Sequence, residues 1–162
     1  MLLVTILEHR KDIRFDLVVN DEQDAIDRYF FGKAKPSNLT VHSRTDNSAT
    51  FYRRASLVLN LSRVDAWVET FGLTILEAMA YGVPVIVPPV GGPAEIVNDA
   101  VQGYVVDSRI TALLNEKVLE LADNSDLCIA MSQAARYRAN DFSFQFFGNE
   151  LRQALKDIIY PI

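Results

Sequence analysis

The sequence predicts an α/β fold, a Rossmann-like parallel sheet flanked by helices. Short apolar runs alternate with segments of helical periodicity along the chain, and the run over residues 56–61 is apolar almost throughout. Strands separated by helices imply βαβ units, and a continuously apolar strand suits a parallel sheet that is covered on both faces. With 162 residues and no clear linker, the chain (1–162) is expected to form a single domain.

Local signals set the order of the elements. Asp21 can cap the first clear helix, and Asp24 can complete a loose capping box. Gly82 can end a helix in a left-handed conformation, and Pro93 suits the first turn of a short helix. Strands are expected at 14–19, 38–42, 56–61, 83–87 and 103–106. Helices are expected at 21–34, 48–55, 72–81, 93–97, 110–122, 126–139 and 144–159.

The charge and the cysteine content argue against several classes of protein. A formal net charge of −5 argues against nonspecific nucleic-acid binding, so no nucleic-acid partner is expected. Cys128 is the single cysteine, which rules out an internal disulfide and favours a reducing, cytoplasmic location. No apolar run reaches the roughly 18 residues of a membrane-spanning helix, and residues 1–7 lack the basic leader of a signal peptide.

The sequence contains no pattern that predicts a metal or another cofactor. His9 and His42 lie far apart and in no metal-ligand spacing, and no Asp-x-Asp pair is present to hold a metal–diphosphate complex. The basic residues Arg136 and Arg138 are expected on a solvated helix face.

Glu77 is the most informative candidate residue. It lies inside the predicted helix 72–81, where nearly all its neighbours are apolar. A carboxylate in such surroundings is costly unless a group pairs with it or donates a hydrogen bond. A polyhydroxylated ligand, such as a ribose or a hexose, is the partner that we expect. The alternative is a solvated glutamate on a partly exposed helix.

Two strand-to-helix junctions have the features of a ligand site, since ligands bind at the carboxyl ends of parallel strands. The first junction runs from Glu69 to Thr74, where the helix start offers unpaired amides and Gly72 permits close backbone approach. In the second, Gly91 and Gly92 precede Pro93 and can admit a phosphate or a sugar. The alternatives are a helix capped by Thr70 and a tight glycine turn.

These residues carry a family resemblance. The pattern Glu69-x7-Glu77, with Phe-Gly-Leu at 71–73 and Leu-Glu-Ala-Met-Ala at 76–80, resembles the signature of retaining GT-B glycosyltransferases of the family 4, or group 1, type. Gly-x-Pro-Val-Ile at 82–86 and Gly-Gly-x-x-Glu-Ile-Val at 91–97 continue the signature in register. The resemblance extends from about Arg14 onward. It implies most of the C-terminal half of a GT-B fold.

The resemblance also implies roles for single residues. Glu77 matches the glutamate that hydrogen-bonds the nucleotide ribose, and Glu69 matches the catalytic-site glutamate that contacts the donor sugar. Amides of the stretch Phe71, Gly72, Leu73 and Thr74 would face the donor sugar and its diphosphate. Gly92 belongs to the same signature. The loop at 41–44, with Ser43, resembles the edge that binds the base.

Two departures from the family pattern matter. The segment 63–68, between Ser62 and Glu69, is longer than the common form. Nothing before Arg14 matches the strand and the Gly-rich segment, with its arginine and lysine, that open the family's nucleotide-binding half. The chain is therefore expected to lack the first strand and the N-terminal acceptor domain, which a further domain or a partner chain would supply.

The expected function follows from the resemblance. It implies the donor-binding part of a metal-independent, retaining transferase that moves a hexosyl group from a nucleotide-diphosphate sugar to a hydroxyl acceptor. The chain alone is expected to be inactive, and the parent enzyme can associate peripherally with a membrane. The alternatives are a nucleotide-sugar-binding or partner-docking module without catalysis and a fragment of a GT-B sugar-nucleotide epimerase.

Overall fold

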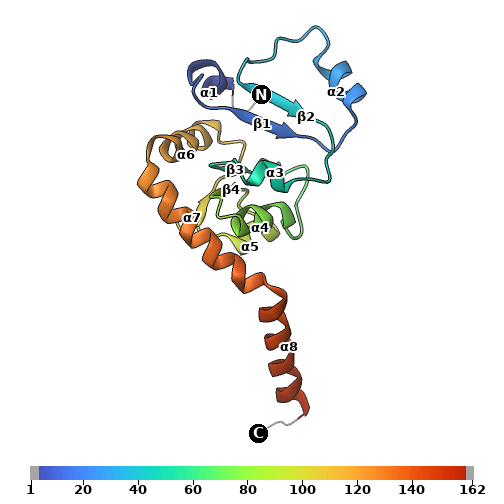
Figure 1. Cartoon of the computed structure of the whole chain (residues 1–162), viewed down its shortest axis with the longest axis vertical. Helices are drawn as coiled ribbons and strands as arrows, with labels where there is room; N and C mark the ends of the chain where they lie inside the picture. Colours follow the sequence, from blue (N-terminus) through green and yellow to red (C-terminus); the bar gives the residue numbers. More distant parts are fainter. Residues whose placement is uncertain (1–3, 160–162) are drawn as a thin grey trace.

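The computed structural model describes residues 4–159 and has the expected α/β architecture, with parallel strands flanked by helices (Figure 1). The strands are β1 (Phe15–Val18), β2 (Leu39–His42), β3 (Val58–Leu59), β4 (Val85–Val87) and β5 (Gly103–Val105). The α-helices are α1 (Val4–His9), α2 (Gln23–Phe30), α3 (Ala49–Tyr52), α4 (Leu73–Ala80), α5 (Gly92–Ile96), α6 (Thr111–Asp123), α7 (Ser125–Ala139) and α8 (Phe144–Ile159). A 3₁₀ turn, η1 (Asn140–Phe142), joins α7 to α8. None of the described helices is long and apolar enough to cross a membrane.

The described strands form two parallel sheets, which agrees with the predicted fold class. β1 pairs with β2, and β3, β4 and β5 pair in that order. Among the described residues, β1 and β3 each have a strand partner on one edge alone. Figure 1 shows β1 between β2 and the larger sheet of β3, β4 and β5. This order matches a doubly wound sheet of order 3-2-1-4-5-6 without its inner strand 1.

β4 is buried on both faces. Val85, Ile86 and Val87 are each fully buried. Ile86 belongs to one core cluster, whereas Val85 and Val87 belong to the other, because successive side chains of a strand point to opposite faces. β3 contacts the core on both faces, as predicted, since Leu59 packs against one core cluster and Val58 against the other. β3 is short and half-buried, since it lies at the edge of its sheet.

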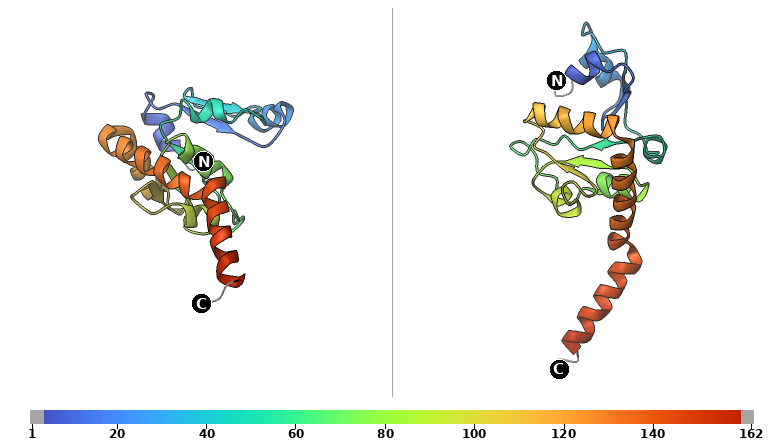
Figure 2. Two further views of the ribbon diagram at one scale, coloured as in Figure 1. Left: turned by 60° about the horizontal axis from the view of Figure 1, so that its bottom comes forward. Right: turned by 90° about the vertical axis from the view of Figure 1, so that its left-hand side faces the viewer.

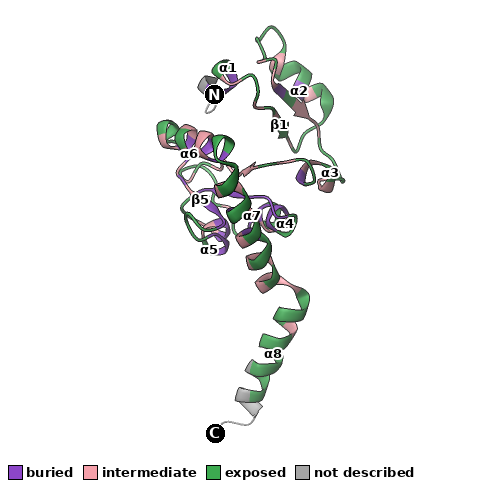
Figure 3. Ribbon diagram, turned by 60° about the vertical axis from the view of Figure 1, so that its left-hand side comes forward, coloured by how far each residue is buried: buried purple, intermediate pink, exposed green. Residues whose placement is uncertain are grey.

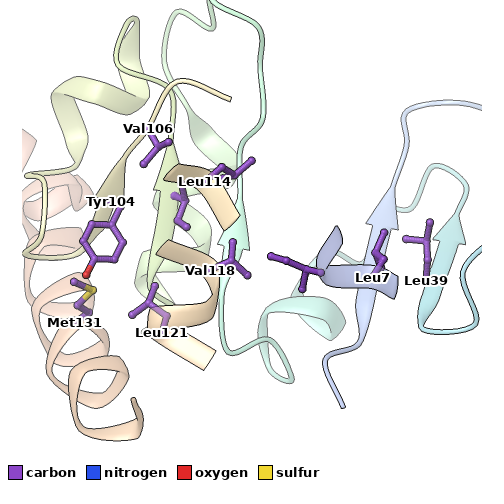
Figure 4. Close-up of a cluster of buried hydrophobic side chains, with 10 residues drawn as sticks. Leu7, Leu39, Tyr104, Val106, Leu114, Val118, Leu121 and Met131 are labelled. Atoms are coloured by element: carbon purple, nitrogen blue, oxygen red, sulfur yellow. The ribbon is translucent and has the colours of Figure 1, made fainter. Parts of the chain in front are cut away.

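The first core cluster joins the two sheets. Leu114, Val118 and Leu121 of α6 pack with Tyr104 of β5 and with Val106, the residue after this strand. Figure 4 shows these side chains facing one another. The same cluster includes Ile6 and Leu7 of α1 and Leu39 of β2. Helix α1 therefore connects the β1–β2 pair to the larger sheet through apolar contacts.

Helix α7 holds α4 and α5 by their carboxyl ends. The Arg136 guanidinium donates to the Tyr81 carbonyl oxygen at 3.0 Å, and the Ser132 hydroxyl donates to the Gly82 carbonyl at 2.6 Å. Arg138 donates to the Ile96 carbonyl at 3.0 Å. Cationic donors stabilise the carbonyl end of a helix. Arg136 is exposed, as expected, whereas Arg138 is half-buried. Both side chains bind backbone that sequence spacing does not place beside them.

The helix boundaries agree broadly with the prediction, but the cap of α2 does not. Glu22 is the residue before α2, and its side chain makes no capping hydrogen bond. Asp21 instead accepts a hydrogen bond from the backbone N–H of Glu22 at 2.9 Å, one position too early to cap the helix. Gly82 adopts the expected positive φ, 74°, after the end of α4.

Helix α8 extends away from the body of the molecule (Figure 2). It is exposed along most of its described length, as Figure 3 shows. Its exposed side chains include Phe144, Phe147 and Leu151, which are 91%, 62% and 47% exposed.

Gly103 should be essential for the packing of β5 against β4. Its φ is 152°, and a Cβ at this position would overlap the Val85 carbonyl group. We expect Gly103→Ala to lower the free energy of unfolding by about 2–5 kcal/mol, measured by urea denaturation. Backbone strain at the positive φ and the overlap of the new Cβ with Val85 both destabilise the folded state. Gly148→Ala is the matched control, since a Cβ there meets open space and should add about 0.5–1 kcal/mol of stability within α8. Equal tolerance of both changes would contradict the prediction.

Candidate functional site

The candidate site lies at the carboxyl ends of β3 and β4. The loop after β3 carries Glu69 and leads into α4, and the loop after β4 carries Gly91 and leads into α5. This is the edge of an open parallel sheet at which ligands bind. The two junctions that the sequence singled out therefore lie on neighbouring strands, which pair in parallel.

The loops of the two junctions pack directly against each other. The Gly92 backbone N–H donates to the Glu69 carbonyl oxygen at 2.9 Å. A Cβ on Gly91 would overlap the same carbonyl, and a Cβ on Gly92 would overlap the backbone of Phe71. Both glycines are thus explained by close backbone approach. This contact brings Glu69, Phe71 and Gly92 together, and it uses the Gly92 amide within the protein.

Asn60 holds the side chain of Glu69. The Asn60 side-chain amide donates to Glu69 Oε2 at 2.7 Å, while its Oδ1 accepts from the backbone N–H of Ser62 at 3.0 Å. Glu69 is half-buried, so this hydrogen bond offsets part of the cost of removing its charge from water. Asn60 is not among the residues that the sequence analysis predicted at the site. The signal was present, because Asn60 is a polar residue at the end of an apolar strand.

The start of α4 offers unpaired amides beside Glu69. Gly72 precedes the helix with a φ of 86° and without a side-chain cap, so the alternative in which Thr70 caps α4 is wrong. Helix geometry leaves the first-turn amides, including those of Leu73 and Thr74, without a carbonyl partner inside the helix. The side chains of Phe71 and Leu73 are 55% and 56% exposed, which leaves this end of the helix open to solvent.

Glu77 has hydroxyl partners within the chain. The Tyr52 hydroxyl donates to Glu77 Oε2 at 3.1 Å, and the Ser48 hydroxyl donates to the same oxygen at 3.4 Å. Burial of the phenol, together with its hydrogen bond to Glu77, raises the pKa of Tyr52 to about 12. Glu77 is half-buried on α4, so it is not the solvated surface glutamate of the alternative interpretation. No sequence pattern predicts Tyr52 or Ser48 at this site, because they lie 25 and 29 residues away along the chain.

A small pocket opens beside Glu77. Its volume is about 230 Å³, below the roughly 300–1,000 Å³ of sites for drug-sized ligands, so it suits one sugar ring rather than a whole nucleotide sugar. The lining residues come from α3 and from the end of α4: Ser48, Ala49, Tyr52, Glu77, Ala80 and Tyr81.

Ser43 lies directly after β2, in the other sheet. It is half-buried and does not line the pocket at Glu77. Its neighbour His42 contacts Asp16 at 2.6 Å, and Arg54 pairs with the same carboxylate at 3.1 Å. The structure does not bring Ser43 into contact with the two glutamates, and its expected role at the base stays a prediction.

Three basic side chains, Arg10, Arg63 and Lys11, bind other groups of the chain. Arg10 pairs with Asp12 and with Asp123 of α6, both at 2.8 Å. Arg63 pairs with Asp65 at 2.7 Å, and this contact raises the pKa of the Arg63 guanidinium and lowers the pKa of the Asp65 carboxyl. The Lys11 ammonium donates to the backbone carbonyl of Leu7 at 2.7 Å.

Comparison with known families agrees with this arrangement. The family model described as glycosyl transferases group 1 matches residues 21–138, which include both junctions. The chain belongs to this family. Solved structures that are similar to it have the GT-B fold, in agreement with the parallel strands and flanking helices.

Two relatives that the chain matches are much longer than the chain itself. It is 36% identical over 99 residues to a D-inositol 3-phosphate glycosyltransferase of Salinispora arenicola, covering 61% of this chain and 21% of the relative. It is 33% identical over 132 residues to sucrose-phosphate synthase 4 of Arabidopsis thaliana, covering 77% of this chain and 12% of the relative. The chain therefore spans about a fifth or less of these two relatives.

Solved structures show the same partial coverage. The structure of HepE from Anabaena in complex with UDP and glucose superposes with a TM-score of 0.78 at 19% identity, covering 96% of this chain and 44% of that one. WaaG, a glycosyltransferase involved in lipopolysaccharide biosynthesis, superposes with a TM-score of 0.71 at 23% identity, covering 99% and 43%. At such identities the superpositions establish the fold.

Proposed function

We propose that this chain is the donor-binding part of a retaining glycosyltransferase of the family 4 type. The parent enzyme would move a hexosyl group from a nucleotide-diphosphate sugar to a hydroxyl acceptor. The main support is Glu77, a half-buried carboxylate with one oxygen held by two hydroxyls, beside a pocket that fits a sugar ring. The HepE structure contains UDP and glucose, which supports a nucleotide sugar as the ligand.

The proposed roles follow the geometry of the site. Glu77 accepts hydrogen bonds from the ribose hydroxyls at the pocket beside α3. Glu69, held by Asn60 next to the start of α4, contacts the donor sugar. The unpaired amides at Leu73 and Thr74 face the diphosphate, since a helix start attracts anions. The reaction proceeds without a metal and with retention at the anomeric carbon, and the enzyme works at the cytoplasmic side, with peripheral membrane association.

The split sheet supports a parent enzyme with further polypeptide. β1 and β3 each have an unpaired edge among the described residues, and the strand order is that of a doubly wound sheet without its inner strand. A strand from outside the chain would pair with both edges and continue into α1. An acceptor-binding domain, on the same polypeptide or on a partner chain, completes the cleft.

Glu77→Gln tests the assignment of the donor site. A hydrogen bond to a charged group contributes about 1.5–3 kcal/mol, so the variant should bind UDP, GDP or ADP about ten-fold more weakly or worse, measured by calorimetry against whichever diphosphate the chain prefers. Glu150→Gln is the control, because this exposed glutamate of α8 lies outside the site. Unchanged affinity in Glu77→Gln would remove the main support for the proposal.

Glu69 should serve the donor sugar and the transition state more than the nucleotide. In the catalytically complete enzyme, Glu69→Ala should depress turnover and leave the affinity for the free nucleoside diphosphate nearly intact. Asn60→Ala should also lower turnover, but by a smaller factor, because Asn60 acts through Glu69. Steady-state kinetics and calorimetry measure the two quantities. An equal loss of both in Glu69→Ala would contradict the division of roles.

The 162-residue chain alone should not transfer sugar. Loss of one preorganised donor can reduce a rate by about 10²–10³-fold. Arg10, Lys11 and Arg63 are each engaged by other groups of the chain, so we expect none of the three to stabilise a leaving diphosphate. Purified chain should therefore show no transfer above background from a panel of nucleotide sugars, measured by release of nucleoside diphosphate. Robust transfer would overturn this prediction. Nucleotide binding without transfer, even with partner proteins added, would favour a non-catalytic binding module.

A further inference from the structure

The contact between α3 and Glu77 suggests a function for Tyr52 beyond packing. Tyr52 is 8% exposed, and its ring lies 5.7 Å from the ring of Tyr81, with an interplanar angle of 37°. The buried ring thus has two anchors, the aromatic contact and the bond from its hydroxyl to Glu77 Oε2. A side chain held at both ends has few rotamers, so it can fix the direction of the group it binds.

Both hydroxyl donors bind the same carboxylate oxygen. Ser48 and Tyr52 reach Oε2, and no described residue donates a hydrogen bond to Oε1. Glu77 itself lines the pocket together with these two residues. A carboxylate that is held through one oxygen presents the other in a fixed direction. An ionised carboxylate has about four lone-pair sites, so capacity for a ligand's hydroxyl groups remains.

The hydroxyl of Tyr52 stays a donor across the physiological range. Burial and the neighbouring carboxylate raise its pKa to about 12, well above neutrality. Loss of the proton would place two negative charges about 3 Å apart in a half-buried site, which is unfavourable.

We propose that Tyr52, with Ser48, is a positioning residue that holds Oε2 of Glu77 so that Oε1 faces the ribose of the nucleotide. This inference rests on the proposed function, because it needs a nucleotide at the pocket. It assigns α3 to the donor site, although the family signature in this sequence begins only at Glu69. Because the carboxylate is already oriented before the nucleotide binds, less conformational freedom is lost on binding, and the affinity for the nucleotide is higher.

The test compares ribose recognition in three proteins: the wild-type chain, Tyr52→Phe and Ser48→Ala. The probes are UDP, GDP and ADP, each with its 2′-deoxy and 3′-deoxy forms, and NMR titration measures the dissociation constants, because this method detects weak binding. The ratio of deoxy to ribo dissociation constants reports the ribose contact by itself. Tyr29→Phe is the control, since it removes a phenol hydroxyl from an exposed side chain of α2.

Tyr52→Phe should weaken binding of the preferred ribonucleotide roughly three- to ten-fold and reduce the deoxy-to-ribo ratio toward one, because its hydrogen bond is to a charged group. Ser48→Ala, with the longer contact, should have a smaller effect in the same direction. Tyr29→Phe should match the wild type. Urea denaturation checks that the variants remain folded.

The remaining outcomes separate this inference from the proposed function. Unchanged affinity, tighter binding, or weaker binding with an unchanged deoxy-to-ribo ratio in Tyr52→Phe would overturn the positioning role and leave the proposed function intact. A wild-type chain that binds without any deoxy penalty would overturn the ribose role of Glu77 and the positioning role together. A wild-type chain that binds no diphosphate would count against the proposed function itself.

Discussion

The burial of β4 on both faces is the constraint on which the rest of the structure depends. Its Val-Ile-Val side chains are fully buried, and each contributes about 1.5–3 kcal/mol relative to exposure. One face requires the cluster of α6 and α7, and the other requires the buried face of α4. Helix α4 can bury Ile75, Ala78 and Met79 against β4 only in one rotational setting, and that setting turns Glu77 toward α3. The position of the candidate ribose carboxylate is thus a consequence of core packing.

Side-chain hydrogen bonds, which add little apolar burial, hold the polar groups of the site in place. Asn60 holds Glu69, and Tyr52 with Ser48 holds Glu77. Half-buried carboxylates are costly without such donors. At the other end of α4, donors from α7 bind the last carbonyls, so the helix is held at its carboxyl end while its first amides stay open. This asymmetry is what an anion site at a helix start requires.

The two sheets are joined by helix α1 and by the ion pairs of one arginine. α1 connects β1 and β2 to the larger sheet through Ile6 and Leu7, and Arg10 adds ion pairs with Asp12 and with Asp123 of α6. These contacts hold the small sheet without any strand pairing between β1 and β3 among the described residues. The same ion pairs occupy Arg10, so this side chain is not available at a diphosphate. The exposed phenylalanines of helix α8 are not covered by another apolar surface of the described chain.

The sequence by itself determined the order of strands and helices, the two junctions and the pair of glutamates. Those features depend on local patterns: apolar runs, glycines that permit positive φ or close approach, and a carboxylate out of place in an apolar helix. Only the tertiary structure decided which groups meet. Segments distant in sequence supply Ser48 and Tyr52 as partners of Glu77. They also bring Arg136 and Arg138 to the ends of other helices. The division into two sheets could not be predicted from the sequence for the same reason. Strand pairing is set by neighbours in space and not by the composition of any one strand.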